Sequence, residues 1–263
     1  MNAVVSEVGA ALSGIAPHVL VGVILVLALA GLIKGTLGFG LPLVAISLLS
    51  NVVEIHLALA LVTLPIVLSN LWLGLQGGDF PGTLRKYWMV VLAVGVGIFA
   101  GSRVLVGIDK NLLMFLLGTV IIVFALAEQF KSGAGLVIPP HAERGWGIAA
   151  GLVAGLMGGL STAYGPPLIM YLTALRLPKE VYIGTLGVIW FFASIFLVAA
   201  FSSVKILTPY TAVLSGLSVF PVFVGMALGK RLRARIDQHL FQRLTLIALV
   251  ILALNLLRRG LWG

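Results

Sequence analysis

Long apolar runs separated by short polar segments make up most of this chain. The runs show no alternation of apolar and polar positions, so they indicate helices rather than the strands of a membrane barrel. A membrane-spanning helix needs about 20 apolar residues. The pattern therefore predicts an all-α integral membrane protein with about eight transmembrane helices, within residues 8–33, 55–78, 87–102 with its flanks, 111–127, 145–175, 181–204, 206–229 and 240–257.

Two motifs rich in glycine and proline interrupt this pattern. Residues 35–42 read Gly-Thr-Leu-Gly-Phe-Gly-Leu-Pro, and residues 158–167 read Gly-Gly-Leu-Ser-Thr-Ala-Tyr-Gly-Pro-Pro. The apolar stretch after the second motif, residues 168–175, would rise only about 12 Å as a helix, which is too short to cross a bilayer. Each motif predicts a broken helix, either a kinked span or a re-entrant hairpin, and the number of spans depends on which form it takes.

Internal repetition divides the chain into two homologous halves. Residues 30–43 match residues 154–168, with one extra residue in the second copy, and residues 97–109 match residues 225–237 without a gap at a spacing of 128. Two matches in the same order at similar offsets indicate a duplication. We expect a first repeat over 1–127, a polar connector over 128–145 and a second repeat over 146–263. Each repeat would hold about four transmembrane helices, with the first helix broken by its Gly/Pro motif.

The composition is that of a protein dissolved in lipid. Hydrophobic residues make up 60% of the chain and charged residues 10%, whereas soluble domains carry about a quarter charged residues. The net charge of +9 comes from basic residues between the apolar runs, as in cytoplasmic loops, so no nucleic-acid partner is expected. The most basic loop, residues 230–243, would lie in the cytoplasm, which places both termini outside it in a multi-pass protein of the cell (plasma) membrane. Four tryptophans near predicted span ends read as interfacial anchors: Trp72, Trp88, Trp146 and Trp262.

Broken helices inside a membrane suggest transport. Backbone groups freed by a break persist in hydrocarbon only where protein or a water-filled cavity satisfies them, and half-helix N-termini favour anions. Secondary transporters place such paired breaks around a substrate site near the membrane midplane. The alternative is that the glycines merely allow close helix packing. The transport hypothesis gives these substrate-binding candidates: Lys34, Gly35, Gly38, Gly40, Pro42, Ser69, Asn70, Gly159, Ser161, Thr162, Tyr164, Gly165, Pro166 and Ser194.

Individual polar residues support this hypothesis to different degrees. Lys34 lies beside the first break, where a lysine either faces a cavity or partner or snorkels to the interface. The polar residues Ser69, Asn70 and Ser194 would line a path or bridge helices. The hydroxyls of the second break would donate to an oxyanion or cap a helix. Two titratable residues at the start of the second span, Glu54 and His56, are candidates for proton coupling.

The two motifs also resemble a known family. Gly35…Gly38-Phe39-Gly40-Leu41-Pro42 and Gly158-Gly159…Gly165-Pro166-Pro167, at the start of two duplicated halves, look like the sulfite exporter TauE/SafE family, and residues 64–72 are similar to many members. The resemblance covers essentially the whole chain. It departs from the family at Gly38-Phe39-Gly40, where many members carry three consecutive glycines. It implies a multi-pass exporter or importer of small sulfur-containing anions.

The sequence therefore predicts a secondary transporter, with export as the expected direction, of sulfite or another sulfur-containing or organosulfonate anion bound between the two broken motifs. The alternatives are a transporter of another small carboxylate or solute, or a channel-like protein. No catalytic motif, nucleotide-binding loop or metal-ligand spacing is present, so we expect no enzyme activity, cofactor or metal. The expected partners are the small anion, membrane lipid and a coupling proton or sodium ion, and a homo-oligomer is compatible with the sequence.

Overall fold

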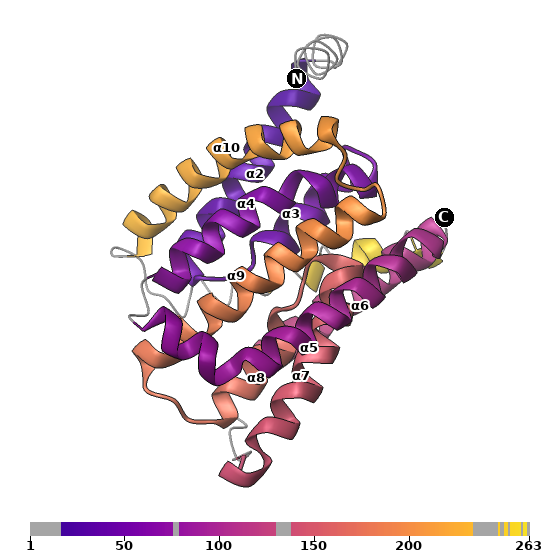
Figure 1. Cartoon of the computed structure of the whole chain (residues 1–263). Helices are drawn as coiled ribbons and strands as arrows, with labels where there is room; N and C mark the ends of the chain where they lie inside the picture. The colour runs from indigo at the N-terminus through magenta and orange to yellow at the C-terminus, as the bar shows by residue number, and fades with distance from the viewer. Residues whose placement is uncertain are drawn as a thin grey trace. The chain divides into compact units, whose positions relative to one another are not determined.

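The computed structural model describes residues 17–75, 79–129 and 138–233, together with residues 247, 250, 251, 253–258, 260 and 261. Every regular element in these ranges is helical (Figure 1). Most of the predicted last span, residues 240–257, lies outside the described residues, as do residues 8–16 of the first. The elements are α2 (Pro17–Leu37), α3 (Leu41–Leu49), α4 (Ile55–Leu75), α5 (Phe80–Gly107), α6 (Lys110–Gln129), the 3-10 turn η2 (Pro140–Ala142), α7 (Glu143–Ser161), α8 (Gly165–Ala174), α9 (Lys179–Ser203) and α10 (Pro209–Arg233).

Five of the described helices are long and apolar enough to cross a membrane: Pro17–Leu37, Ile55–Leu75, Phe80–Gly107, Val181–Ser203 and Pro209–Leu232. Large apolar side chains cover their outer faces. Leu25 and Val96 are each 63% exposed and Phe220 is 76% exposed, which is stable only against lipid or another apolar surface. The predicted class, an all-helical membrane protein, is therefore confirmed.

The chain forms two compact units that do not follow the sequence repeats. One unit combines Met1–Ile66 with Phe201–Ala248, and the other combines Val67–Ala200 with Leu249–Gly263. The chain passes from one unit to the other within α4 and again within α9. Each unit thus contains the first helix of one sequence half and the third helix of the other half.

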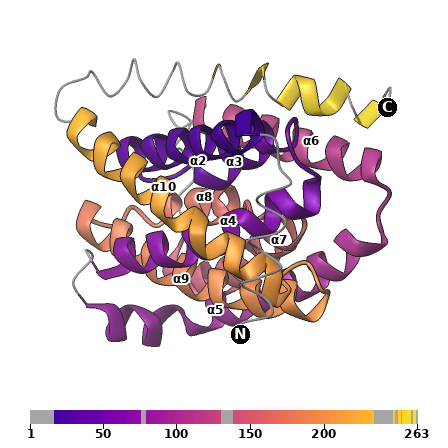
Figure 2. The ribbon, with the colours of Figure 1, turned by 90° about the horizontal axis from the view of Figure 1, so that it is seen from above.

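In the first unit, glycines bring α2 and α10 into backbone contact (Figure 2). Gly31 faces the carbonyl oxygen of Val222, and Gly225 faces that of Ala28, so closely that a Cβ atom would collide with the opposite backbone. Small residues allow membrane helices to approach in this way and to gain dispersion energy along their length. The order of contacts shows that α2 and α10 run in the same direction.

In the second unit, α5 and α7 repeat this interface residue for residue. Moving from α2 to α7 adds 124 to each residue number, and moving from α5 to α10 adds 128. The matching contacts are Gly31–Val222 with Gly155–Val94, Gly35–Met226 with Gly159–Ile98, Gly225–Ala28 with Gly97–Leu152, and Gly229–Leu32 with Gly101–Leu156. The same close packing is therefore built twice, each time from one helix of each sequence half.

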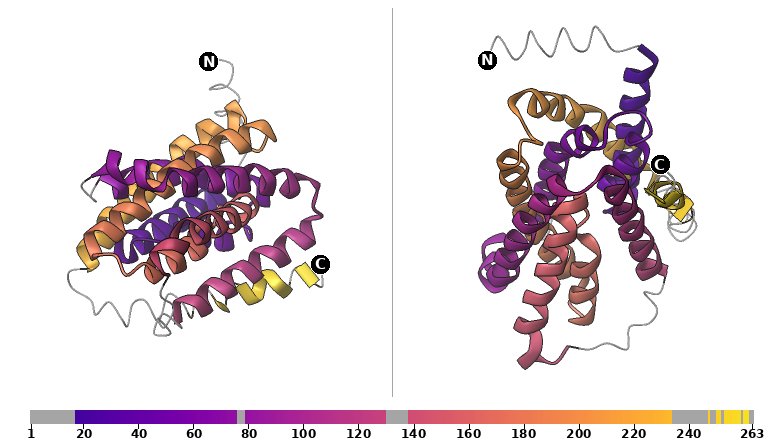
Figure 3. Two further views of the ribbon diagram at one scale, coloured as in Figure 1. Left: turned by 60° about the horizontal axis from the view of Figure 1, so that its bottom comes forward. Right: turned by 90° about the vertical axis from the view of Figure 1, so that its right-hand side faces the viewer.

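Helix α8 folds back beside α7 rather than continuing its direction (Figure 3). The hydroxyl of Tyr171, in α8, donates to the carbonyl oxygen of Glu143, the first residue of α7, at 3.2 Å. The backbone N–H of Ile138, just before α7, donates to the carbonyl of Ala174 at the end of α8 at 3.3 Å. The end of α8 therefore lies near the start of α7. In the first unit, Val53 lines the same apolar groove as Val19, so the chain after α3 also comes back toward the start of α2.

Proline inside α4 creates a polar requirement that α10 meets. Pro65 has no N–H, so the carbonyl of Leu61 loses its helical donor. The hydroxyl of Ser215 donates to this carbonyl at 3.2 Å and accepts from the N–H of Leu64 at 3.0 Å. This exchange joins α4 to α10 within the first unit and keeps the freed backbone groups hydrogen-bonded.

Candidate functional site

The second break is a tight turn between α7 and α8. Thr162 ends α7 in the left-handed region at a φ of 59°, and its N–H donates to the carbonyl of Gly158 at 2.6 Å. A left-handed residue commonly ends a helix, but it is usually glycine, because a side chain there costs about 1–2 kcal/mol. Helix α8 starts at Gly165, followed by Pro166 and Pro167, which fit the first turn because its N–H groups need no helical partner.

A buried polar network connects this break to α4 and α9. The Asn70 side-chain nitrogen donates to the Tyr164 hydroxyl at 2.8 Å and to the carbonyl of Trp190 at 3.2 Å. The Tyr164 hydroxyl lies 3.5 Å from the same carbonyl. All three residues are at most 5% exposed. Three elements of the second unit thus meet through side chains that can donate hydrogen bonds.

Two serines extend this polar region. Ser194 lies one turn beyond Trp190 on α9; its side chain hydrogen-bonds with Tyr164, and its hydroxyl donates to the carbonyl of Phe191 at 2.6 Å. Ser69 adjoins Asn70 on α4 and is 1% exposed. Both serines lie inside the second unit.

Two buried donors of this region have no hydrogen-bond partner among the described residues: the indole Nε1 of Trp190 and the hydroxyl of Thr162. Buried polar groups in proteins are almost always paired, so such exceptions often mark a site for water, an ion or a ligand. The start of α8 adjoins the indole, since a Cβ atom on Gly165 would lie 3.6 Å from its Cζ2. The indole N–H is a donor only, and it therefore requires an acceptor.

The remaining hydroxyl of the turn is used locally. The Ser161 hydroxyl donates to the carbonyl of Met157 at 2.6 Å and accepts from the N–H of Ala163 at 3.3 Å. This serine stabilises the end of α7.

The first break, in the other unit, relies on two left-handed glycines. Gly38 has a φ of 87° and Gly40 a φ of 92°, values that side chains rarely adopt. Pro42 occupies the first turn of α3, where the N–H groups of Leu41 and Leu43 have no helical acceptor. Lys34, in the last turn of α2, is only 6% exposed.

The predicted glycines divide into two structural groups. Gly35 and Gly159 face the backbones of Met226 and Ile98 on the adjoining helices, so their small size serves helix packing. A Cβ atom on Gly38 would meet nothing within 4 Å, and its left-handed backbone serves the turn instead. The alternative of close packing thus accounts for two of the candidate glycines.

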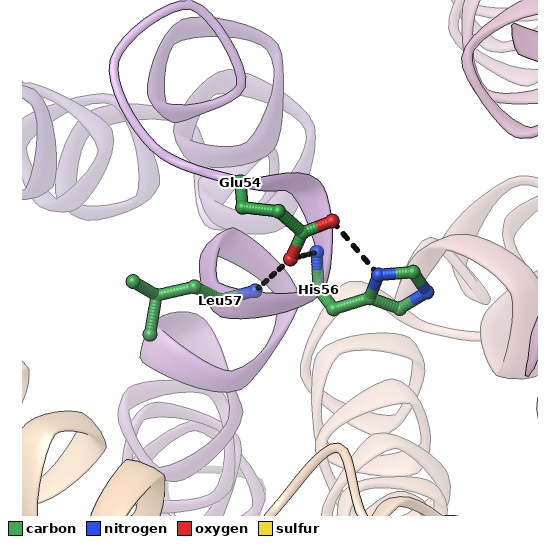
Figure 4. Close-up of polar contacts among 3 residues, drawn as sticks. All are labelled: Glu54, His56 and Leu57. Carbon is green, nitrogen blue, oxygen red and sulfur yellow. Dashed lines mark hydrogen bonds and ion pairs between the residues drawn. The ribbon is translucent and has the colours of Figure 1, made fainter. Parts of the chain in front are cut away.

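The proposed proton-coupling pair lies at the start of α4 (Figure 4). The Glu54 carboxylate accepts from the N–H groups of His56 and Leu57, at 2.8 and 3.2 Å, and contacts His56 Nδ1 at 2.8 Å. Partial burial opposes ionisation, but the hydrogen bonds and the charge of His56 outweigh it and lower the pKa of Glu54 below 4.5. Glu54 therefore acts as an ionised cap of α4.

The predicted set divides between the two units, and part of it forms a network within the second unit. Asn70, Tyr164 and Ser194 form one network, with Ser69, Gly159, Ser161, Thr162, Gly165 and Pro166 in the same unit, while Lys34, Gly35, Gly38, Gly40 and Pro42 belong to the other unit. The sequence hypothesis missed Trp190. The one signal for Trp190 in the sequence is that it lies in the middle of an apolar run, whereas tryptophans that anchor a helix at the membrane interface lie near its ends.

Spanning helices with lipid-facing apolar surfaces, and a buried polar network at a helix break, define a multi-pass membrane protein. The chain belongs to the sulfite exporter TauE/SafE family, whose model matches residues 23–256. Membership implies a membrane transporter of sulfite or related anions rather than an enzyme. A search of curated proteins and a search of solved structures gave no match.

Proposed function

We propose that this protein is a secondary transporter that exports sulfite or another small sulfur-containing anion across the cell membrane, and that the second break holds part of its substrate site. The observation that supports this most directly is the pair of buried donors without partners, Trp190 Nε1 and the Thr162 hydroxyl. A sulfur oxyanion offers several acceptor oxygens and no obligatory donor, so it complements such groups.

Energetics favour an anion over an apolar solute at this site. A buried donor without an acceptor costs about 1–3 kcal/mol, and a hydrogen bond to a charged group contributes about 1.5–3 kcal/mol. Asn70 and Tyr164 hydrogen-bond to the backbone carbonyl of Trp190 and so hold the residue that carries the indole. Pro166 and Pro167 carry no N–H, so side chains rather than the main chain supply most donors at this break.

The first break contributes to the same function by different means. The amides of Leu41 and Leu43 lie in the first turn of α3, at the positive end of its helix dipole. Lys34, in the last turn of α2, supplies a basic side chain. A lysine within a spanning helix is expensive unless it faces a partner or a polar path. We assign Lys34 to anion attraction.

Replacing Trp190 by Phe tests the site. The change removes the indole N–H and keeps an aromatic ring, so we expect the KM for sulfite to rise about tenfold, equivalent to about 1.4 kcal/mol. The measurement is saturable sulfite transport in proteoliposomes. Trp146→Phe is the matched control, because Trp146 is 54% exposed and outside the network. Equal KM values for Trp190→Phe and wild type would remove the indole from the site.

The same vesicles distinguish a carrier from a channel and identify the substrate. In a counterflow experiment, vesicles preloaded with unlabelled sulfite are placed in labelled sulfite. A carrier transiently accumulates the label inside the vesicles, whereas a channel does not. Competition by sulfate, thiosulfate, organosulfonates and small carboxylates ranks the substrates. Counterflow inhibited by carboxylates alone would favour the carboxylate alternative, and absence of counterflow would favour a channel.

A further inference from the structure

A polar pocket lies near the starts of α5 and α7 and beside α8, in the same unit as the second break. It has a volume of about 320 Å³ and is lined by Arg85, Lys86, Tyr87, Trp88, Met89, Val90, Pro140, Glu143, Arg144 and Tyr171. Small-molecule sites typically begin near this size. The pocket is separate from the network around Asn70.

Positive charge dominates its lining. Three cationic side chains, Arg85, Lys86 and Arg144, share the pocket with one carboxylate, Glu143. Lys86 pairs with Glu143 at 3.2 Å and also lies 5.0 Å from the centre of the Tyr87 ring. The two arginines remain in excess, and arginine is the side chain best shaped to hold an oxyanion through two hydrogen bonds.

A buried hydroxyl in this pocket lacks a well-formed hydrogen bond within the described part of the chain. Tyr87 is 3% exposed, and its hydroxyl interacts with the side chains of Lys86 and Glu143, but neither contact has good hydrogen-bond geometry. Helix α5 is kinked at this residue, with a φ of −105° and a ψ of 16°. Tyr87 lines the pocket at this kink.

Backbone donors reinforce the preference for an anion. Helix α7 begins at Glu143, and its N-cap residue, Ala142, supplies no side-chain cap. The N–H of Glu143 donates to the carbonyl of Pro140, so the next amides of the first turn and the positive end of the helix dipole adjoin the pocket. The Tyr171 hydroxyl, by contrast, already donates to the carbonyl of Glu143 and mainly shapes the wall.

The membrane fixes the level of this pocket. Beyond the kink at Tyr87, residues 88–107 of α5 are about 30 Å long, which matches the roughly 30 Å hydrocarbon core. Its basic start therefore lies at the headgroup level, next to Trp88, which is 47% exposed and suited to an interface.

We propose that this pocket binds a tetrahedral oxyanion, either the phosphate of an anionic lipid headgroup or a free oxyanion of similar shape. Arg85 and Arg144 provide the charge, Tyr87 donates a hydrogen bond, and the start of α7 supplies amides. The proposal does not rest on the substrate site at the second break, and Trp190→Phe is expected to leave this binding unchanged.

Purified protein in detergent tests the proposal with two probes. Native mass spectrometry compares phosphatidylglycerol with phosphatidylcholine of the same acyl chains, and calorimetry measures inorganic phosphate. We expect phosphatidylglycerol to bind about tenfold more tightly than phosphatidylcholine, and Arg144→Gln to remove most of this preference. Tyr87→Phe should weaken binding several-fold without lowering the unfolding temperature in the absence of ligand, because it removes a buried hydroxyl that makes no well-formed hydrogen bond with the described residues. Arg103→Gln, at the opposite end of α5, is the control.

The outcomes separate the two sources. Binding of inorganic phosphate that the same variants weaken supports a free oxyanion, and a preference for phosphatidylglycerol without phosphate binding supports a lipid headgroup. The proposal is overturned if neither probe binds selectively, or if Arg144→Gln and Tyr87→Phe bind both probes as wild type does.

Discussion

Lys34 is a buried basic residue in the last turn of α2, beside the first break. Its side chain is buried in α2, and the carbonyl of the same residue accepts from the N–H of Gly38 at 2.7 Å. The residue thus belongs structurally to the turn as well as to the helix. Its main-chain role does not require a lysine, so the side chain is what a substitution probes.

We expect Lys34→Ala to reduce kcat/KM for sulfite at least tenfold, since a hydrogen bond to a charged group contributes about 1.5–3 kcal/mol. Lys34→Arg keeps the charge and should retain part of the activity. The measurement is initial transport rate against sulfite concentration in proteoliposomes, with the unfolding temperature as a check on folding. Wild-type kinetics in the Ala variant would refute the role.

Glu54 gives a pH-dependent prediction that is independent of transport. Its folded-state pKa lies below its ordinary value of 4.5, so the capping contribution is present above that value and is lost as pH falls through the folded pKa. We expect the unfolding temperature to be insensitive to this group at neutral pH and to decline in acid below pH 4.5. Glu54→Gln should have a lower unfolding temperature at pH 7 and a smaller acid decline. An unchanged acid decline in this variant would contradict the assignment.

At the level of elements, the paired glycines of α2 with α10 and of α5 with α7 are the main packing device. Small residues along these helices were visible in the sequence, and the repetition of those of α5 in α10 at a spacing of 128 suggested equivalent roles. Which helices they join was not visible, because Gly31 meets Val222 across most of the chain. Local pattern predicts that a helix has a contact face and does not identify the partner.

One residue on α2 offers a matched pair of substitutions. We expect Gly31→Ala to destabilise the protein by about 1–3 kcal/mol, because its Cβ would overlap the Val222 carbonyl and force the helices apart. Gly22→Ala, on the same helix, meets nothing within 4 Å and should be neutral or slightly stabilising. Thermal unfolding in detergent compares them. Equal unfolding temperatures would mean that α2 and α10 do not pack as described.

The sequence predicted the helices and the individual polar residues, but not which residues of different helices contact one another. Apolar run length and composition predict an all-helical membrane protein because backbone satisfaction in lipid leaves few other choices. Asn70 and Tyr164 stand out as polar residues among apolar ones, but their 2.8 Å contact depends on how α4 and the break pack. Trp190 escaped notice because an indole in an apolar run reads as core until its N–H is seen to have no partner.

At the scale of the whole molecule, the form of the second break decides how the chain crosses the membrane. The expected count of eight spans treated residues 145–175 as one crossing. The return of α8 toward the start of α7, through the contact of Tyr171 with Glu143, instead predicts a re-entrant hairpin, in which residues 145–175 make no crossing. We therefore expect the segments before α7 and after α8 to lie on the same side of the bilayer.

Single cysteines test this directly, because the chain contains no native cysteine. His141→Cys precedes α7, Leu177→Cys follows α8, and Gly107→Cys lies at the end of α5, which runs in the same direction as α7. In sealed vesicles of one orientation, a membrane-impermeant maleimide should either label both the 141 and the 177 variants or label neither. The 107 variant should give the opposite result. A kinked span would instead carry the chain across, so labelling of positions 141 and 177 from opposite sides would exclude the hairpin. Because each variant carries one thiol at a helix end, the three accessibilities report the path of this unit without depending on transport activity.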